Sequence, residues 1–164
     1  MARAIHNESA RTDGPLVSVN CRALPRELVV SEFLGFEAGV LRGSQGQPSK
    51  FELAHGGTLH LEEIDALPLE MQGALLRVID TGEVMRLGGS RVIPVDVRFI
   101  VSAATDLERH VINGEFRADL FYALSRISLH LPALRDRMAD LPLIVNATLD
   151  RLRRQSGRRV EVST

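Results

Sequence analysis

Residues 56–67 read GGTLHLEEIDAL, and this stretch decides the fold class. A largely apolar run over Thr58–Leu61 ends in two adjacent carboxylates, Glu62 and Glu63, before apolar character resumes at Ile64. In an open α/β sheet, ligands lie beyond the carboxyl ends of the strands, so a buried strand that ends in acidic residues is typical of a site. One carboxylate there suits Mg²⁺, which prefers oxygen ligands, and a second suits the orientation of a water beside a phosphate. The alternative interpretation is a surface turn with two solvated acids.

Composition places the chain among soluble globular domains. The 164 residues are 45% hydrophobic and 25% charged, which suits one domain with its own core. No apolar stretch approaches the roughly 20 residues that cross a bilayer. The single Cys21 allows no intrachain disulfide, so we expect a cytoplasmic protein. A net charge of −1 provides no general attraction to nucleic acid, and the sparse aromatic residues argue against a stacking platform for single strands.

Helical and extended patterns alternate along the chain. Apolar, extended patterns predict strands at residues 16–19, 58–61, 97–102 and 127–131, with a hairpin at 83–87 and 91–94. Helical patterns are found at residues 1–9, 24–34, 50–54, 68–79, 107–113, 116–124 and 141–155. A glycine-rich loop spans residues 35–49. This alternation predicts a mainly parallel sheet covered by helices.

Several stretches resemble one protein family in order and spacing. They are FELAHGGTLHLEEIDALPLEMQGALLRVIDTGEVMRLGGSRVIPVDVRFI, NGEFRADLFYAL, LPALRDRMADLP and, before them, ARAIHNES and VNCRALPRELVVSEFLG. In these motifs the chain resembles the central AAA+ ATPase domain of bacterial enhancer-binding transcription activators, the sigma-54 activators. The resemblance covers essentially all 164 residues and implies an α/β, three-layer P-loop NTPase fold with a mainly parallel sheet. It also implies ATP and Mg²⁺ as cofactors, self-association into a ring, and RNA polymerase with its sigma factor as partner.

The resemblance also indicates which parts of the family fall outside this sequence. The family's phosphate-binding loop precedes the helix that ends in ARAIHNES, and this chain starts inside that helix. The helical lid and the C-terminal DNA reader would follow Thr164. We therefore expect residues 1–164 to be a partial AAA+, or sigma-54 interaction, domain that lacks the P-loop strand, a sensor domain and a DNA-binding domain; a genuine short protein is the alternative. On this expectation the chain alone binds nucleotide poorly, contacts DNA only through the absent domain, and has no membrane partner.

Three site residues follow from the resemblance, position by position. Glu62 matches the carboxylate that holds Mg²⁺ through a water, and Glu63 matches the one that positions the attacking water. Both are therefore implied to contact the cofactor and to act in catalysis. Arg117 matches an arginine that reaches the nucleotide of the neighbouring subunit. The family's acidic pair is normally Asp-Glu, so Glu62 is one methylene longer than the usual residue.

Other positions depart from the family pattern. The family's sigma-contact loop reads Gly-Ala-Phe-Thr-Gly-Ala, and the matching residues are Gly39, Val40, Leu41, Arg42, Gly43 and Ser44. Because Leu41 only partly replaces the aromatic contact area, we expect weak action on sigma-54. The polar sensor position is occupied by Ala103 and Ala104, and the second intersubunit arginine is replaced by Ala123. An arginine supplied in trans contributes several orders of magnitude to the rate of phosphoryl transfer, so we expect slow or absent hydrolysis.

Two functions therefore remain open. The first is a nucleotide-responsive, ring-forming AAA+ module that activates transcription through nucleotide-dependent action on RNA polymerase. The second is a non-hydrolysing scaffold, as the chain is also similar to a subgroup that includes the regulator of the dihydroxyacetone kinase operon. That subgroup works with the housekeeping polymerase.

The remaining polar residues have plainer interpretations. The five histidines show no metal-ligand spacing such as HExxH, so no zinc site is predicted. Cys21 is predicted to be a packed thiol, since no His–acid partner accompanies it. A solvated helix face is the interpretation for the basic residues Arg151, Arg153, Arg154, Arg158 and Arg159. By resemblance, Arg135 and Arg137 serve contacts between domains or subunits.

Overall fold

The computed structural model describes residues 1–40 and 45–156. The chain divides into two units, residues 1–126 and a second unit that begins at Ile127, and each is described by itself. In the described part of the chain, no helix has both the length and the apolar character that crossing a membrane requires.

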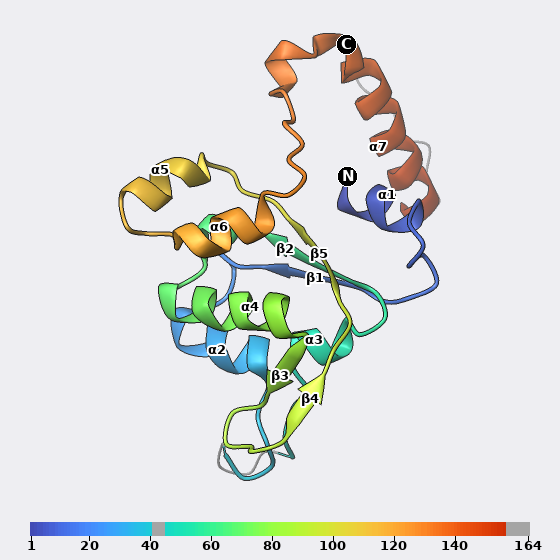
Figure 1. Cartoon of the computed structure of the whole chain (residues 1–164). Coiled ribbons are helices and arrows are strands. Elements are labelled where there is room, and N and C mark those ends of the chain that lie inside the picture. Colours follow the sequence, from blue (N-terminus) through green and yellow to red (C-terminus); the bar gives the residue numbers. More distant parts are fainter. Residues whose placement is uncertain (41–44, 157–164) are drawn as a thin grey trace. The chain divides into compact units, whose positions relative to one another are not determined.

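Three parallel strands form the sheet of the first unit (Figure 1). They are β1 (Leu16–Asn20), β2 (Thr58–Glu62) and β5 (Arg98–Val101), in the order β1-β2-β5. In the parallel register of the central strand, Leu59 faces Val17 on one side and Phe99 on the other. The carboxyl ends of the strands therefore meet at one edge of the sheet. The predicted α/β class with a parallel sheet is confirmed.

The core lies between the sheet and three helices gathered on one side of it (Figure 1). These helices are α2 (Arg26–Leu34), α3 (Lys50–Leu53) and α4 (Leu69–Thr81). Successive side chains of a strand point to opposite faces, and Leu59 and Leu61 on the core face of β2 are fully buried. Their helical partners in the core include Phe33, Phe51 and Leu75. Burial of this apolar surface is the main force that holds the first unit together.

A short helix contacts the other face of the sheet. This helix, α1 (Ala2–Asn7), carries the buried His6, whose Nδ1 lies 2.9 Å from Oγ1 of Thr58. Thr58 precedes Leu59 on β2 and so points away from the core face. Helices therefore contact both faces, which is the three-layer arrangement that the resemblance implies.

The first unit also holds an antiparallel hairpin and two short helices. The hairpin pairs β3 (Glu83–Met85) with β4 (Val92–Pro94), as the sequence predicts, and the helices are α5 (Leu107–Ile112) and α6 (Ala118–Leu124). α4 ends where Gly82 adopts a left-handed conformation with φ of 66°, which glycine adopts without a steric penalty.

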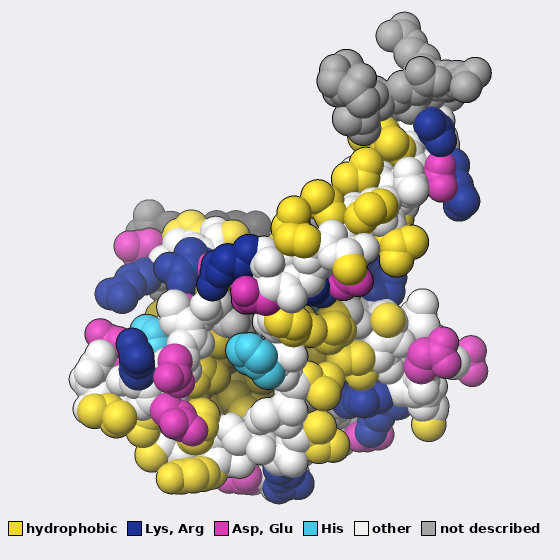
Figure 2. Space-filling view, turned by 90° about the horizontal axis from the view of Figure 1, so that it is seen from above, with side chains coloured by type: hydrophobic (Ala, Val, Ile, Leu, Met, Phe, Trp, Pro, Cys, Tyr) yellow, Lys and Arg dark blue, Asp and Glu magenta, His cyan; other side chains and the backbone are white. Residues whose placement is uncertain are grey.

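The second unit contains 3-10 turns at Leu134–Asp136 and Met138–Asp140, followed by α7 (Leu141–Ser156). Figure 2 shows hydrophobic side chains along α7, and Leu143, Ile144 and Leu152 are among its exposed residues. Among the basic residues of this helix, Arg153 pairs with Asp150 at 3.1 Å, which agrees with a solvated helix face. Arg158 and Arg159 lie outside the described residues.

The predicted strand at residues 127–131 is wrong. The segment has no regular structure, and Ile127, Leu129 and Leu131 are 85%, 66% and 49% exposed. Alternating apolar residues form a strand only when a neighbouring strand supplies ladder hydrogen bonds. Among the described residues, no strand pairs with this segment, so the pattern alone does not suffice.

Candidate functional site

The acidic pair lies where the sequence predicts it, at the carboxyl end of β2. Glu62 is the last residue of the strand, and Glu63 adopts a left-handed conformation with φ of 51° and ψ of 53°. It is the one non-glycine residue with positive φ in the described part of the chain. Residues other than glycine rarely adopt this backbone conformation, and those that do are enriched at functional sites. The backbone at Glu63 is therefore locally strained, and the surrounding contacts keep it in this conformation.

Both carboxylate oxygens of Glu63 are engaged. Its Oε1 accepts a hydrogen bond from Nδ2 of Asn20 at 3.0 Å, and its Oε2 accepts one from Nε of Arg22. Asn20 closes β1, and Arg22 follows it by two residues. Hydrogen bonds from Asn20 and Arg22 hold the pKa of Glu63 below its usual range. Glu63 is thus an ionised carboxylate held by the last residue of the neighbouring strand and by an arginine that follows that strand.

Glu62 has a different environment. Its side chain is 43% exposed, and its contact is an Oε1 atom 3.4 Å from Nδ1 of His60. Burial lowers the pKa of His60, so this contact is with a mainly neutral imidazole at neutral pH. Of the two acids, Glu62 therefore keeps its oxygens available for a ligand.

Asp65 is a third acid of this edge, and the sequence reading did not include it. Its side chain is 1% exposed, and its Oδ2 accepts hydrogen bonds from Arg22 at 2.9 Å and from Oγ1 of Thr105 at 3.1 Å. The backbone N–H of Ala104 donates to Oδ1 at 3.4 Å. Asp65 therefore joins the residues after β1 to those after β5, and Arg22 joins it to Glu63.

The predicted sensor residues lie at this same edge. Ala103 and Ala104 follow β5 and are exposed. Their side chains offer no hydrogen bond, but the backbone of Ala104 contributes through Asp65. Thr105 continues the polar chain to Nε2 of His110 at 2.9 Å. Residues after all three strands thus meet in one polar cluster, as the carboxyl ends of parallel strands do in open α/β sheets.

Cys21 lies beneath this cluster. It is 2% exposed, and burial together with the charges of Asp65 and Glu63 raises the pKa of its thiol to about 12. The thiol is therefore protonated and unreactive at neutral pH, which agrees with the predicted packed role.

Arg117 lies at the start of α6 and is not part of the acidic cluster. Its Nε and terminal nitrogen donate to the carboxylate of Asp119 at 3.0 and 2.6 Å, and its side chain is 44% exposed. Hydrogen bonds from Arg117 hold the pKa of Asp119 below its usual range, so the two side chains form an ion pair at neutral pH. Ala123 follows six residues later on the same helix and is half-buried.

The predicted sigma-contact loop is described only at its start. Gly39 has φ of 86°, Val40 is 43% exposed, and Leu41, Arg42, Gly43 and Ser44 lie outside the described residues. The base of this loop is paired with the hairpin: Glu37 donates its N–H to Leu87 at 3.0 Å. At the hairpin tip Gly88 has φ of 72°, and a Cβ there would lie 2.3 Å from Val40. Loop and hairpin tip therefore pack closely, and only glycine fits at that contact.

Arg86 at the end of the hairpin strand reinforces this arrangement. It donates to the two carboxylate oxygens of Glu52 at 2.9 and 2.5 Å and lies 3.8 Å from the carboxylate of Glu37. The Glu52 side chain is only 15% exposed, so this is a bidentate, largely buried ion pair. It connects the hairpin to α3 and to the base of the loop.

Replacing Arg86 by methionine is expected to lower the free energy of unfolding at neutral pH by about 2 kcal/mol, because Glu52 loses its charged hydrogen bonds. Hydrogen bonds from Arg86 lower the pKa of Glu52 from 4.5 to about 2. The pair therefore stabilises the folded chain above about pH 4.5, and its contribution disappears as the pH falls toward about 2. Urea unfolding followed by circular dichroism across this range measures the difference, with the exposed Arg77→Met as control. A difference between parent and R86M that does not shrink on acidification contradicts the assignment.

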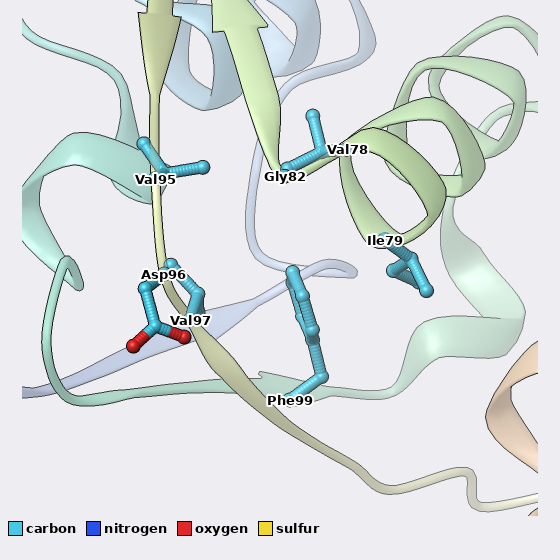
Figure 3. Close-up of a pocket in the computed structure, with 7 residues that line it drawn as sticks. All are labelled: Val78, Ile79, Gly82, Val95, Asp96, Val97 and Phe99. Carbon is cyan, nitrogen blue, oxygen red and sulfur yellow. The ribbon is translucent and has the colours of Figure 1, made fainter.

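A small hollow elsewhere in the first unit carries no comparable chemistry (Figure 3). Its volume is about 140 Å³, and it is lined by Val78, Ile79, Gly82, Val95, Asp96, Val97 and Phe99. The one charged group, the Asp96 carboxylate, is paired with Arg11 at 2.6 Å. The hollow therefore offers only one charged side chain, which is already paired, and the polar cluster at the strand ends is the candidate site.

Comparison with known proteins identifies the family that the chain resembles. Residues 1–130 match the model of the sigma-54 interaction domain family. The chain is 47% identical to a Nif-specific regulatory protein of Herbaspirillum seropedicae over 159 residues, covering 96% of this chain and 29% of that protein. It is 46% identical over 162 residues to the DNA-binding transcriptional activator HyfR of Escherichia coli, covering 98% of this chain and 24% of that protein. Among solved structures, NtrX of Brucella abortus in complex with ATP matches with a TM-score of 0.87 and 36% identity, over 99% of this chain and 35% of that chain.

Proposed function

Because the chain belongs to the sigma-54 interaction domain family, we propose that it is the ATP-binding AAA+ module of a longer bacterial transcription regulator that acts on RNA polymerase. The observation that carries this proposal is the acidic cluster at the strand ends, in which Glu62 is 43% exposed and Glu63 is hydrogen-bonded by Asn20 and Arg22. The relatives support it: HyfR is named a DNA-binding transcriptional activator, and NtrX was crystallised with ATP. The chain spans only 29% and 24% of the two curated relatives, so the longer regulator is part of the proposal.

The residues at the strand ends fit Mg²⁺ as part of a nucleotide complex. Mg²⁺ keeps several waters and is held by one or two carboxylates together with substrate phosphates. Glu62 offers such a carboxylate, whereas no group of three or more His, Cys, Asp or Glu among the described residues could hold a metal by itself. Bound Mg²⁺ would supply the charge that neutralises the phosphates. Glu62 is therefore the residue we assign to the metal, through a water.

Glu63 orients the water that attacks the outer phosphate in this proposal. Its carboxylate is ionised, as the role requires, but both oxygens are occupied by Asn20 and Arg22. Each carboxylate oxygen can accept a second hydrogen bond, so Glu63 can orient a water while Asn20 and Arg22 remain in place.

Arg117 acts on the nucleotide of a neighbouring subunit, which requires self-association into a ring. Its guanidinium is half-exposed and held by an equally exposed Asp119, so it is available to an anionic group from outside the chain. A separate domain contacts DNA, and the loop that begins at Gly39 contacts the sigma factor. The regulator works in the cytoplasm.

A non-hydrolysing scaffold that works with the housekeeping polymerase is the second candidate. Ala103, Ala104 and Ala123 favour it, because a polar sensor and a second arginine are both replaced. We expect the rate of hydrolysis to be low in either case.

Replacing Glu63 by glutamine in the intact regulator tests the first candidate. ATP binding with Mg²⁺ should be retained, while the hydrolysis rate should fall by about 100-fold, in the range of a lost catalytic carboxylate. Calorimetric titration measures binding, and single-turnover phosphate release measures hydrolysis. Glu70→Gln, an exposed acid of α4, is the matched control and should change neither.

The outcomes separate the candidates. No ATP binding by the unmodified regulator contradicts the nucleotide-binding proposal. Binding without any hydrolysis supports the scaffold, and equal hydrolysis by the parent and E63Q contradicts the role of Glu63.

A further inference from the structure

Gln72 is a polar side chain in an otherwise apolar part of the core. It lies on α4 between core residues such as Met71 and Leu75, and it is 0% exposed. Burying an amide costs free energy unless its hydrogen bonds are restored inside the protein. A fully buried glutamine therefore needs partners, and the identity of those partners indicates its role.

The amide of Gln72 is hydrogen-bonded to the backbone of the segment that leads into α6. Its Nε2 donates to the carbonyl of Glu115 at 3.1 Å, and its Oε1 accepts from the backbone N–H of Arg117 at 2.8 Å. Phe116, between these two residues, is 2% exposed and anchors the segment in the core. The side chain of Gln72 thus pairs with the backbone on both sides of Phe116, as a neighbouring strand would.

These contacts fix the position of Arg117. As the residue before the first turn of α6, it has an extended backbone with φ of −73° and ψ of 130°. Next to Gln72, Gly73 lies beside the guanidinium: a Cβ at that glycine would be 3.7 Å from a terminal nitrogen of Arg117. One stretch of α4 therefore sets the backbone of Arg117 and borders its charged end.

The second N–H of the same amide points to the acidic cluster. Nε2 of Gln72 also donates to the carbonyl of Leu67 at 2.7 Å. Leu67 ends the turn that begins at Glu63, and its N–H is bonded to Ile64 at 3.0 Å. A glutamine amide has two donor hydrogens, and both are used. Gln72 therefore connects the segment behind Glu63 to the segment that carries Arg117.

We propose that Gln72 is a positioning residue for Arg117, which sets where that arginine is presented to a neighbouring subunit and links it to the turn behind Glu63. The inference rests on the proposed function, in which Arg117 acts on a neighbour's nucleotide. It predicts an effect in one direction: substitution of Gln72 lowers the rate of ATP hydrolysis at the neighbouring subunit's site more than the rate at the site of its own subunit.

Mixed rings of the intact regulator test this direction. An E63Q subunit supplies only Arg117, and an R117A subunit supplies only Glu63, so their mixture should recover hydrolysis. Gln72→Met, which keeps the size but removes all three hydrogen bonds, should lower the recovered rate at least about tenfold when it is placed in the E63Q subunit. Placed in the R117A subunit, it should change the rate less than about twofold, within ordinary mutational scatter.

Val78→Ala provides the matched control, because Val78 is also buried on α4 but lies beside Val95 and Phe99 at the hollow. It should act equally in both subunits. Hydrogen exchange supplies a second readout: the N–H of Arg117 should exchange faster in Q72M, while that of Leu61 on the central strand keeps its rate.

Equal losses from Q72M in both subunits, or an unchanged exchange rate at Arg117, overturn the inference. In either event the mixture of E63Q and R117A stays active. A mixture without activity, or an R117A ring as fast as the parent, overturns instead the role of Arg117 in the proposed function.

Discussion

Replacing Ala123 by arginine is expected to raise the rate of ATP hydrolysis by the intact regulator about 100-fold or more. The position lies on α6, six residues after Arg117, and is half-buried. An arginine there can lay its stem along the helix and extend its charged end into solvent. An arginine finger contributes a factor of about 10³ to 10⁵ in phosphoryl-transfer enzymes, because it neutralises charge that develops on the transferred group. We expect less than the full factor, since Ala103 and Ala104 remain.

The control is Ala118→Arg, which adds the same charge at an exposed alanine of the same helix. Single-turnover measurements with radiolabelled ATP detect slow rates in the parent as well as faster rates in the variants. If A123R hydrolyses ATP no faster than A118R, the missing arginine does not limit turnover. The alanines after β5 would then be the limiting replacements, and the scaffold would be favoured.

Replacing Phe51 by alanine is expected to cost about 3–5 kcal/mol of unfolding free energy, the range for a large buried aromatic side chain. Phe51 is fully buried, and its ring lies 6.2 Å from that of Phe33 on α2 and 6.3 Å from that of Phe99 on β5, measured between centroids. Its helix, α3, has only four residues and is capped by the reciprocal hydrogen bonds of Ser49 and Glu52. So short a helix is not stable alone, and Phe51 attaches it to the core.

Leu53→Ala on the same helix is the matched control, because Leu53 is 46% exposed. It should change the stability by no more than about 0.5 kcal/mol. The chain has no tryptophan, so urea unfolding is best followed by far-ultraviolet circular dichroism. A cost below about 1 kcal/mol for F51A would show that the cavity collapses, and would contradict the packing described here.

Local patterns in the sequence predicted most of the first unit. The strands at Leu16–Asn20, Thr58–Glu62 and Arg98–Val101 were expected within a residue or two, because their apolar runs are bounded by glycine, proline or polar residues. The same kind of pattern failed at residues 127–131. A helix satisfies its own backbone, but a strand depends on a partner that its own sequence does not specify.

Some residues of the site could likewise be predicted from the sequence, and others could not. Glu62 and Glu63 could be predicted because they are adjacent and directly follow an apolar run. Asn20 closes the first strand, and the rule that parallel strands end at one edge could have identified it. Arg22 could not be found by such a rule, since its contact with Glu63 depends on the left-handed turn at that residue.

Gln72 is the clearest example of a residue whose role the sequence does not predict. In the sequence it is one polar residue within an amphipathic helix, and nothing there distinguishes it from a solvent-facing position. Its three hydrogen bonds join residue 67 to residues 115 and 117, which lie far from it along the chain.

The sequence by itself therefore determined the sheet, the helices that cover it, and the presence of two acids at a strand end, because these follow from short-range periodicity and burial. Only the tertiary structure decided which groups hold those acids: Asn20 and Arg22 on Glu63, and a buried Asp65 between the ends of β1 and β5. The physical reason is that hydrogen bonds and ion pairs act over about 3 Å, so a partner is chosen by packing and not by position along the chain.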